Sequence, residues 1–167
     1  MGFESGEPAL DRYFAEHAVA NSRRGIGKAF VLRSPPGAPD LPAVIGFYTL
    51  SMAALERTAL PVSTQKGVPA YPMPVALIGR FAIDRRAQRQ GFGRVLLQDA
   101  LERVLAVSED IGCFGVLVDA KNGAAVAFYR STGFEPTAPE PGAFPCRMFL
   151  PMKTLRGARK PTAPDPT

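Results

Sequence analysis

Apolar residues recur along the chain at helical and extended spacings, and these spacings predict the order of its elements. Residues 7–21 carry Leu10, Phe14 and Ala18 at helical spacing, which predicts an amphipathic helix that ends near Gly25. Residues 92–108 have the same spacing and predict a longer helix. Short apolar runs predict strands at residues 26–33, 43–50, 75–84, 114–119 and 146–152, with a further extended segment from Phe134.

A short helix and an irregular segment complete this pattern. Asn122 is a good capping residue for a helix over residues 123–131, and Gly133 can end that helix in the left-handed conformation. Four prolines and a glycine exclude long regular elements from residues 51–74. The order is therefore helix, hairpin, loop, strand, helix, strand, helix, strand. It predicts a mixed α/β fold with one sheet.

Length and composition predict a single domain. The chain has 167 residues, of which 46% are hydrophobic, enough to bury a substantial core. We expect this domain to span residues 1–155. Residues 156–167 are basic and then proline-rich, and we expect a disordered tail there.

The same composition excludes several classes of protein. No run of about 18 apolar residues is present, so we expect no membrane-spanning helix. The first twelve residues contain no apolar stretch of the kind found in secretory signals. Cys113 and Cys146 are isolated from each other and from the single histidine, which predicts neither a zinc site nor a disulfide framework. These features fit a cytoplasmic protein without a metal. The net charge of +5 fits an acidic partner and equally fits a basic protein without one.

The segment with the most residues suited to ligand binding is the turn between the strand at 75–84 and the helix at 92–108. It contains three arginines and is followed by a fourth, Arg94, and it leads into the helix through two closely spaced glycines, Gly91 and Gly93. Glycines at such a turn let backbone amides converge on an anion, and the helix N-terminus adds partial positive charge. The turn is therefore a candidate phosphate-binding site.

Three kinds of phosphate-binding turn compete for this stretch. A Walker loop requires GxxxxGK[ST], and that string is absent. A dinucleotide-binding turn requires GxGxxG. Leu96 stands where its third glycine would be, although Asp119 is placed to mimic the ribose-binding acid. The third pattern is Q/RxxGxG/A, which residues 88–93 match as QRQGFG.

This third pattern resembles the coenzyme A pyrophosphate loop of the GNAT N-acetyltransferases. Asn122 followed by AVAFYRSTGFE at residues 125–135 resembles a second segment of the family, N…A…FYxxxGF. In that family the tyrosine hydroxyl, here Tyr129, protonates the departing thiolate. Without the motif, Tyr129 reads as a core aromatic and Asn122 as a helix cap. The resemblance implies cofactor contacts from Phe81, Ala82, Ile83, Gln88, Arg89, Gln90, Gly91, Phe92, Gly93, Arg94, Asn122 and Phe128.

The resemblance covers residues 3–152 and is closest to the GNAT toxins of bacterial type II toxin–antitoxin systems. It implies the GNAT acyltransferase fold, a mixed and mostly antiparallel central sheet flanked by helices. It also implies an enzyme that uses acetyl-CoA to acetylate the α-amino group of aminoacyl-tRNA, which blocks translation. The implied partners are a ribbon-helix-helix antitoxin and a second copy of the chain. Related chains carry a strand upstream of the segment that begins here at Phe3, so we expect a difference at that sheet edge.

The chemistry of acyl transfer bears on the acceptor. The amine must be neutral when it attacks the thioester directly, and a lysine with a pKa of about 10.4 would need a dedicated base. An α-amine with a pKa of about 8 is already partly neutral. Glu56, Asp84 and Asp119 are candidate bases, and none of them stands out. This favours an α-amine acceptor. A small-molecule amine, a protein N-terminus, or a binding module without turnover remain alternatives.

Basic residues near the first helix and the turn are candidates for contacts with the tRNA backbone. Each of them also fits an ordinary solvated surface charge. The candidates are Arg23, Arg24, Lys28, Arg80, Arg85 and Arg86.

Overall fold

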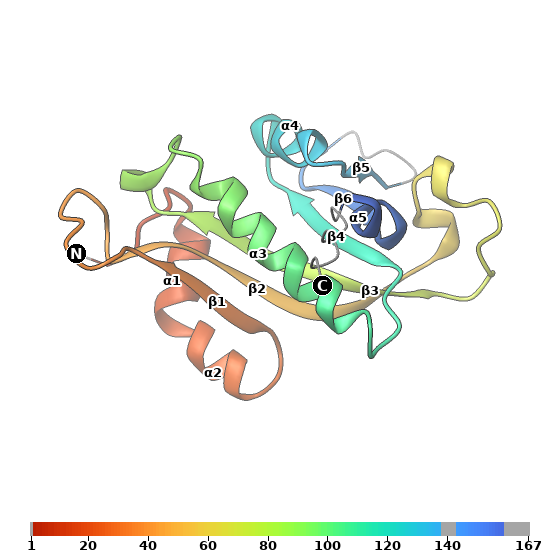
Figure 1. Ribbon diagram of the computed structural model, residues 1–167, viewed down its shortest axis with the longest axis horizontal. Coiled ribbons are helices and arrows are strands. Elements are labelled where there is room, and N and C mark those ends of the chain that lie inside the picture. Colours follow the sequence, from red (N-terminus) through yellow and green to blue (C-terminus); the bar gives the residue numbers. More distant parts are fainter. Residues whose placement is uncertain (1, 138–142, 159–167) are drawn as a thin grey trace, which may run out of the picture. The chain divides into compact units, whose positions relative to one another are not determined.

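The computed structural model describes residues 2–137 and 143–158 (Figure 1). The chain forms two compact units. The first comprises Met1–Ala53 and Ala76–Val104, and the second comprises Ala54–Val75 and Leu105–Thr167. In the described ranges, no helix has the length and hydropathy needed to cross a membrane.

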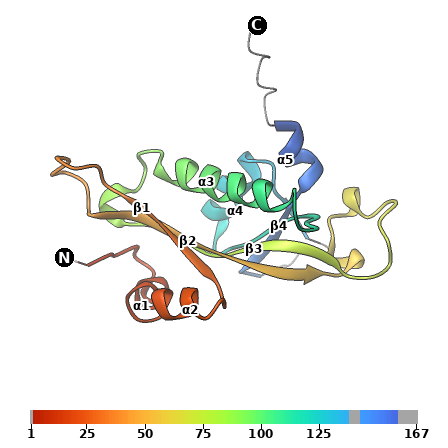
Figure 2. The same cartoon turned by 60° about the horizontal axis from the view of Figure 1, so that its bottom comes forward.

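The first unit is a small sheet with helices on both faces (Figure 2). Its strands lie in the order β1-β2-β3, and β1 and β2 pair antiparallel from Lys28↔Leu50 to Arg33↔Val44. This pairing confirms the predicted hairpin. The elements are α1 (Pro8–Glu16), α2 (Ala18–Arg23), β1 (Lys28–Arg33), β2 (Val44–Leu55), β3 (Met73–Ile83), the 3-10 turn η3 (Arg85–Ala87) and α3 (Phe92–Val107), with the ends of β2, β3 and α3 belonging to the second unit.

The prediction of one helix over residues 7–21 is wrong in one respect, because the helix is divided in two. His17 ends α1 with φ −122° and ψ −26°, and α2 begins at the next residue. After the break, Ala18 is buried in a core that includes Leu10, Tyr13, Phe47 and Ala82. Burial of Ala18 in this core thus accompanies a break that no glycine or proline signals.

One glycine lets the strands of this unit approach the start of α3 closely. A Cβ atom on Gly46 would lie 2.6 Å from Ile83 Cδ1 and 2.8 Å from the Ala82 carbonyl oxygen. It would also lie 3.2 Å from Leu96 Cδ2 in the second turn of α3. The missing side chain therefore fixes how closely the end of β3 and the beginning of α3 pack on β2.

The second unit is built around an antiparallel pair of strands. β4 (Gly115–Ala120) pairs with β6 (Cys146–Pro151), and the two-residue β5 (Glu135–Pro136) lies on the other side of β6. Its other elements are α4 (Gly123–Ser131), α5 (Met152–Ala158) and the 3-10 turns η1 (Arg57–Ala59) and η2 (Val62–Thr64). The helix predicted over residues 123–131 is confirmed, with Asn122 Oδ1 accepting from the Ala125 amide at 2.9 Å.

Two predicted boundaries are corrected. The irregular segment is shorter than residues 51–74, because β2 continues to Leu55 and β3 begins at Met73. Pro74 has no amide hydrogen to donate to a neighbouring strand, and it is tolerated in β3 at an exposed position. Its carbonyl accepts from the Phe114 amide at 2.8 Å. The disordered tail predicted from Arg156 does not begin there, since α5 continues to Ala158. Residues 159–167 of that tail lie outside the described residues.

Candidate cofactor and catalytic site

The turn between β3 and α3 contains two residues with positive φ. Arg89 adopts φ +62° and Gly91 adopts φ +87°, just before α3 begins at Phe92. Arg89 is the sole residue with positive φ, apart from glycines, within residues 2–137 and 143–158. Such a conformation costs roughly 1–3 kcal/mol and is typical of functional sites. No atom lies within 4 Å of the position of a Cβ on Gly91, so the turn is open there.

The residues of the predicted motif divide into two groups by their surroundings. Gln88 donates its side-chain amide to the carbonyls of Ile83 and Ser5, both at 2.9 Å, and Gln90 donates to the Arg86 carbonyl at 3.2 Å. These two side chains brace the turn. Arg89 is exposed. The rest lie in the last residues of β3 (Phe81, Ala82, Ile83) or in the first turn of α3 (Phe92, Gly93, Arg94).

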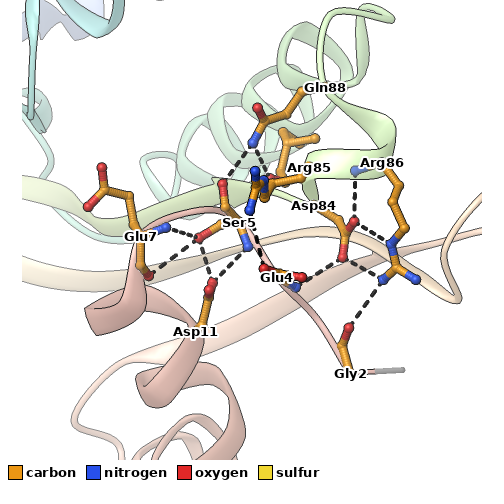
Figure 3. Close-up of polar contacts among 10 residues, drawn as sticks. Gly2, Glu4, Ser5, Glu7, Asp11, Asp84, Arg85, Arg86 and Gln88 are labelled. Carbon is orange, nitrogen blue, oxygen red and sulfur yellow. Dashed lines mark hydrogen bonds and ion pairs between the residues drawn. The ribbon is translucent and has the colours of Figure 1, made fainter.

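A buried carboxylate, Asp84, anchors the turn from below (Figure 3). Its Oδ1 accepts from the Arg86 amide at 3.0 Å and from Arg86 Nε at 2.8 Å, and its Oδ2 accepts from Arg86 Nη2 at 2.8 Å. Oδ2 also accepts from the Glu4 amide at 3.0 Å. The Arg86 side chain holds the pKa of Asp84 at about 2, against the opposing effect of burial. From the sequence Asp84 is a candidate base, whereas these bonds make it a structural anion.

This lowered pKa predicts an acid-sensitive fold. The contribution of Asp84 to stability is complete above its ordinary pKa of 3.8 and is lost as the pH falls towards its folded value of about 2. The difference corresponds to about 2 kcal/mol. We expect Asp84→Asn to lower the free energy of unfolding at pH 7. The gap in this free energy between wild type and the variant should narrow as the pH falls from about 4 to about 2.

Urea denaturation of both proteins across this pH range measures the gap. Asp110→Asn is the control, since Asp110 is exposed beyond the end of α3, and it should change stability by less than about 0.5 kcal/mol. A gap that is constant from pH 7 to pH 2 would contradict the assignment of Asp84 as a paired anion.

In the second unit, Tyr129 lies on the buried side of α4. The residue is 6% exposed, and its ring packs against Phe128 and Phe134 with centroids 5.2 Å and 5.5 Å away. Burial raises the pKa of Tyr129 well above its ordinary value, and the negative charge of Asp119 raises it further. The hydroxyl therefore keeps its proton across the physiological pH range, as a general acid must.

The three candidate bases differ in their surroundings. Asp84 is buried and paired with Arg86. Asp119 forms a two-point ion pair with Arg147, at 2.9 Å and 3.1 Å. Glu56 is exposed beyond the end of β2. Two of the three carboxylates are thus already paired with an arginine. The pKa of Asp84 is also lowered, the opposite of the shift that suits a general base.

The basic residues predicted to contact tRNA also divide by their surroundings. Arg86 is bound to Asp84, Arg85 pairs with Glu4 at 3.3 Å, and the Arg80 guanidinium lies 3.6 Å from the centre of the Tyr13 ring. Lys28 donates to the Ser22 carbonyl at 2.9 Å near the end of α2. The exposed side chains of Arg23 and Arg24 follow at the same helix end.

A second polar cluster in the first unit has no counterpart in the sequence analysis. The buried hydroxyl of Tyr48 donates to Asp99, which also accepts from Arg103 Nε at 3.1 Å. The Arg103 guanidinium lies 4.0 Å from the centre of the Phe30 ring, and that ring stacks on Tyr48. The cluster ties β1, β2 and α3 together. Within the described ranges, no group of three or more potential metal ligands is present.

Comparison with known proteins places this chain in a family. The model of the acetyltransferase (GNAT) domain matches residues 64–155, and the chain belongs to the GNAT acetyltransferases. It is 35% identical to a "tRNA-acetylating toxin" of Mycobacterium tuberculosis over 154 residues, which cover 92% of this chain and 86% of that protein. The family and the fold predicted from the sequence are thereby confirmed.

Solved structures agree with this assignment. The AtaT toxin complexed with acetyl-methionyl-tRNAfMet has a TM-score of 0.80 and 36% identity, with coverage of 92% of this chain and 88% of that chain. A tyrosine-to-phenylalanine mutant of AtaT, bound to the C-terminus of the antitoxin AtaR and to acetyl-CoA, has a TM-score of 0.72 and 31% identity, with coverage of 92% and 86%.

Proposed function

We propose that this acetyltransferase transfers the acetyl group of acetyl-CoA to the α-amino group of aminoacyl-tRNA and acts as the toxin of a toxin–antitoxin pair. The observation that carries the proposal is the likeness, over 92% of the chain, to a tRNA-acetylating toxin and to a toxin complexed with an acetylated aminoacyl-tRNA. The chain's own residues support it at two places, the turn before α3 and the buried Tyr129.

The turn before α3 suits the pyrophosphate of acetyl-CoA. Its backbone is open at Gly91, it precedes the positive end of a helix, and Arg89 and Arg94 lie within or directly after it. Arg89, Gly91, Phe92, Gly93 and Arg94 would hold the cofactor, while the last residues of β3, Phe81, Ala82 and Ile83, would orient its pantetheine arm. Asn122 and Phe128 are proposed as further cofactor contacts. Bound acetyl-CoA supplies an activated thioester.

Tyr129 is proposed as the general acid that protonates the departing thiolate. Its burial keeps the hydroxyl protonated until transfer. The attacking amine needs no dedicated base when it is an α-amine with a pKa of about 8, because a useful fraction is neutral at pH 7. The pairing of Asp84 and Asp119 with arginines supports this choice of acceptor.

The test is transfer of labelled acetyl from acetyl-CoA to charged tRNA. We expect label on the aminoacyl end of methionyl-tRNA and of other charged tRNAs that the enzyme accepts. The matched control is formyl-methionyl-tRNA, in which the same α-amine is blocked. Label on the formylated tRNA or on uncharged tRNA would contradict the proposed acceptor. Transfer to a small amine or a protein N-terminus, with none to charged tRNA, would support the alternative GNAT activity.

The partners and setting follow from the same proposal. We propose a cytoplasmic enzyme, because charged tRNA is its proposed substrate. Arg23 and Arg24 are proposed as contacts with the tRNA phosphates. Weaker candidates, because they already have partners, are Lys28, Arg80, Arg85 and Arg86. We also propose a ribbon-helix-helix antitoxin and a homodimer. A related toxin bound to an antitoxin's C-terminus supports an antitoxin partner.

A further inference from the structure

The segment Gly2–Ser5 lies against the first residues of the turn between β3 and α3, the proposed cofactor site (Figure 3). The Glu4 amide donates to Asp84 Oδ2 at 3.0 Å, and the Glu4 carbonyl accepts from the Arg85 amide at 2.8 Å. The carbonyl of Gly2 accepts from Arg86 Nη2 at 3.1 Å, and that of Ser5 accepts from Gln88 Nε2 at 2.9 Å. Residues about 80 positions apart in the chain thus share a continuous set of backbone and side-chain bonds.

The segment is also fixed on the side away from the turn. The Phe3 ring packs on Phe14 and Phe47, with centroids 5.0 Å and 5.4 Å away. The Ser5 amide donates to Asp11 Oδ1 in the first turn of α1 at 2.8 Å, and the Ser5 hydroxyl donates to the same oxygen. The segment therefore links α1 and its aromatic core to the turn.

The bonds to the segment and the bonds that shape the turn come from the same side chains. The Asp84 carboxylate binds both the Glu4 amide and the Arg86 side chain. The same carboxylate caps the N-terminus of η3. Gln88 donates to Ser5 and, with the same amide nitrogen, to Ile83 at the end of β3. Displacement of the segment would leave the buried Asp84 with fewer donors and Gln88 with one acceptor fewer. Both losses favour rearrangement of residues 85–91.

We propose that the segment Gly2–Ser5 holds the turn in its cofactor-binding conformation, with Asp84, Arg86, Gln88 and Asp11 as positioning residues. This inference rests on the proposed binding of acetyl-CoA at the turn. Docking of the segment and binding of coenzyme A are then coupled, and because coupling between two sites is reciprocal, each must strengthen the other by the same factor.

Three variants test the coupling in the full chain, with coenzyme A as the probe. Arg86→Lys keeps the charge but cannot make the two-point contact with Asp84. Asp11→Ala frees Ser5 from α1. Within the described part of the chain the Asp11 carboxylate bonds to Ser5 and not to the turn, so an effect on cofactor binding must pass through the segment. Arg103→Lys is the matched control, because it alters an Asp–Arg pair about two turns into α3.

Calorimetric titration should show that Arg86→Lys weakens coenzyme A binding by about tenfold, within the usual range for coupled sites. Asp11→Ala should weaken it in the same direction but less, and Arg103→Lys should stay within about twofold of wild type. For Asp11→Ala, a residue outside the proposed contacts with cofactor and tRNA, the apparent KM for acetyl-CoA should rise while kcat at saturating acetyl-CoA changes little. General destabilisation would instead lower the amount of active enzyme and with it kcat. In wild type, coenzyme A should slow hydrogen exchange at the amides of Glu4 and Arg85.

The outcomes separate this inference from the proposed function. If wild type fails to bind coenzyme A, the proposed cofactor site is wrong. If wild type binds it and both Arg86→Lys and Asp11→Ala bind equally well, the positioning role is wrong and the cofactor site stands. If Arg86→Lys fails to fold, Asp11→Ala and the exchange at Glu4 decide: an unchanged affinity together with unchanged exchange overturns the coupling.

Discussion

Replacing Tyr129 with phenylalanine is expected to slow acetyl transfer by about 10²–10⁴-fold, the usual contribution of a general acid. The substitution removes one oxygen from a ring that packs between Phe128 and Phe134, so the core of the second unit should keep its packing. Binding of acetyl-CoA should be unchanged within about twofold, because the hydroxyl acts on the leaving group and not on the ground state.

Single-turnover transfer from labelled acetyl-CoA to charged tRNA measures this loss directly. Tyr71→Phe is the control, since Tyr71 is 67% exposed and precedes β3 in the second unit. Tyr71→Phe should transfer at the wild-type rate. If Tyr129→Phe also transfers at that rate, Tyr129 is not the acid, and its motif reflects packing alone.

Gly115→Ala is expected to have the largest effect on stability, lowering the free energy of unfolding by about 3 kcal/mol, the upper end of the range for overpacked cores. A Cβ atom on Gly115 would overlap the ring of Phe149 and lie 2.5 Å from the Leu150 carbonyl oxygen. Phe149 is fully buried and Leu150 contributes backbone, so neither can move aside without disturbing the pairing of β4 with β6.

Urea denaturation with Gly123→Ala as the control tests this prediction. Gly123 is the first residue of α4, and no atom lies within 4 Å of its Cβ position. Alanine there should be neutral or stabilising by up to about 1 kcal/mol, because it is the better helix former. Equal stability of the two variants would show that the β4–β6 pair shifts to admit a methyl group.

Elements with explicit end signals were predictable from the sequence. α4 was predicted at both ends, because Asn122 has a capping side chain and Gly133 adopts φ +101° after the helix. The division of α1 from α2 could not be predicted, because His17 is not a residue type that signals a break in a helix. The extensions of β2 and β3 depend on pairing with neighbouring strands, which composition does not reveal. α5 follows Pro151 directly and contains Gly157, a weak helical sequence.

The candidate site shows the same distinction. The sequence singles out the turn at residues 88–93 and Tyr129 because each lies in a compact motif, and their roles stay predictions. The role of Asp84 could not be identified in this way, because its partner amide belongs to Glu4, 80 residues earlier. The sequence makes Arg85 and Arg86 candidates for tRNA contacts but cannot show that they are paired, because an unpaired charge and a paired one look alike in a sequence. The structure shows both engaged with acidic residues of the same unit.

The bond between the Gly2 carbonyl and Arg86 has a practical consequence for handling the protein. A purification tag fused directly ahead of Gly2 would join the chain beside this bond. If the segment holds the turn as proposed, a bulky or charged tag there would compete with the segment for its place, and the affinity measured for coenzyme A would fall. The same tag moved to the other end of the chain, or removed by a protease, gives the comparison by which such measurements are best calibrated.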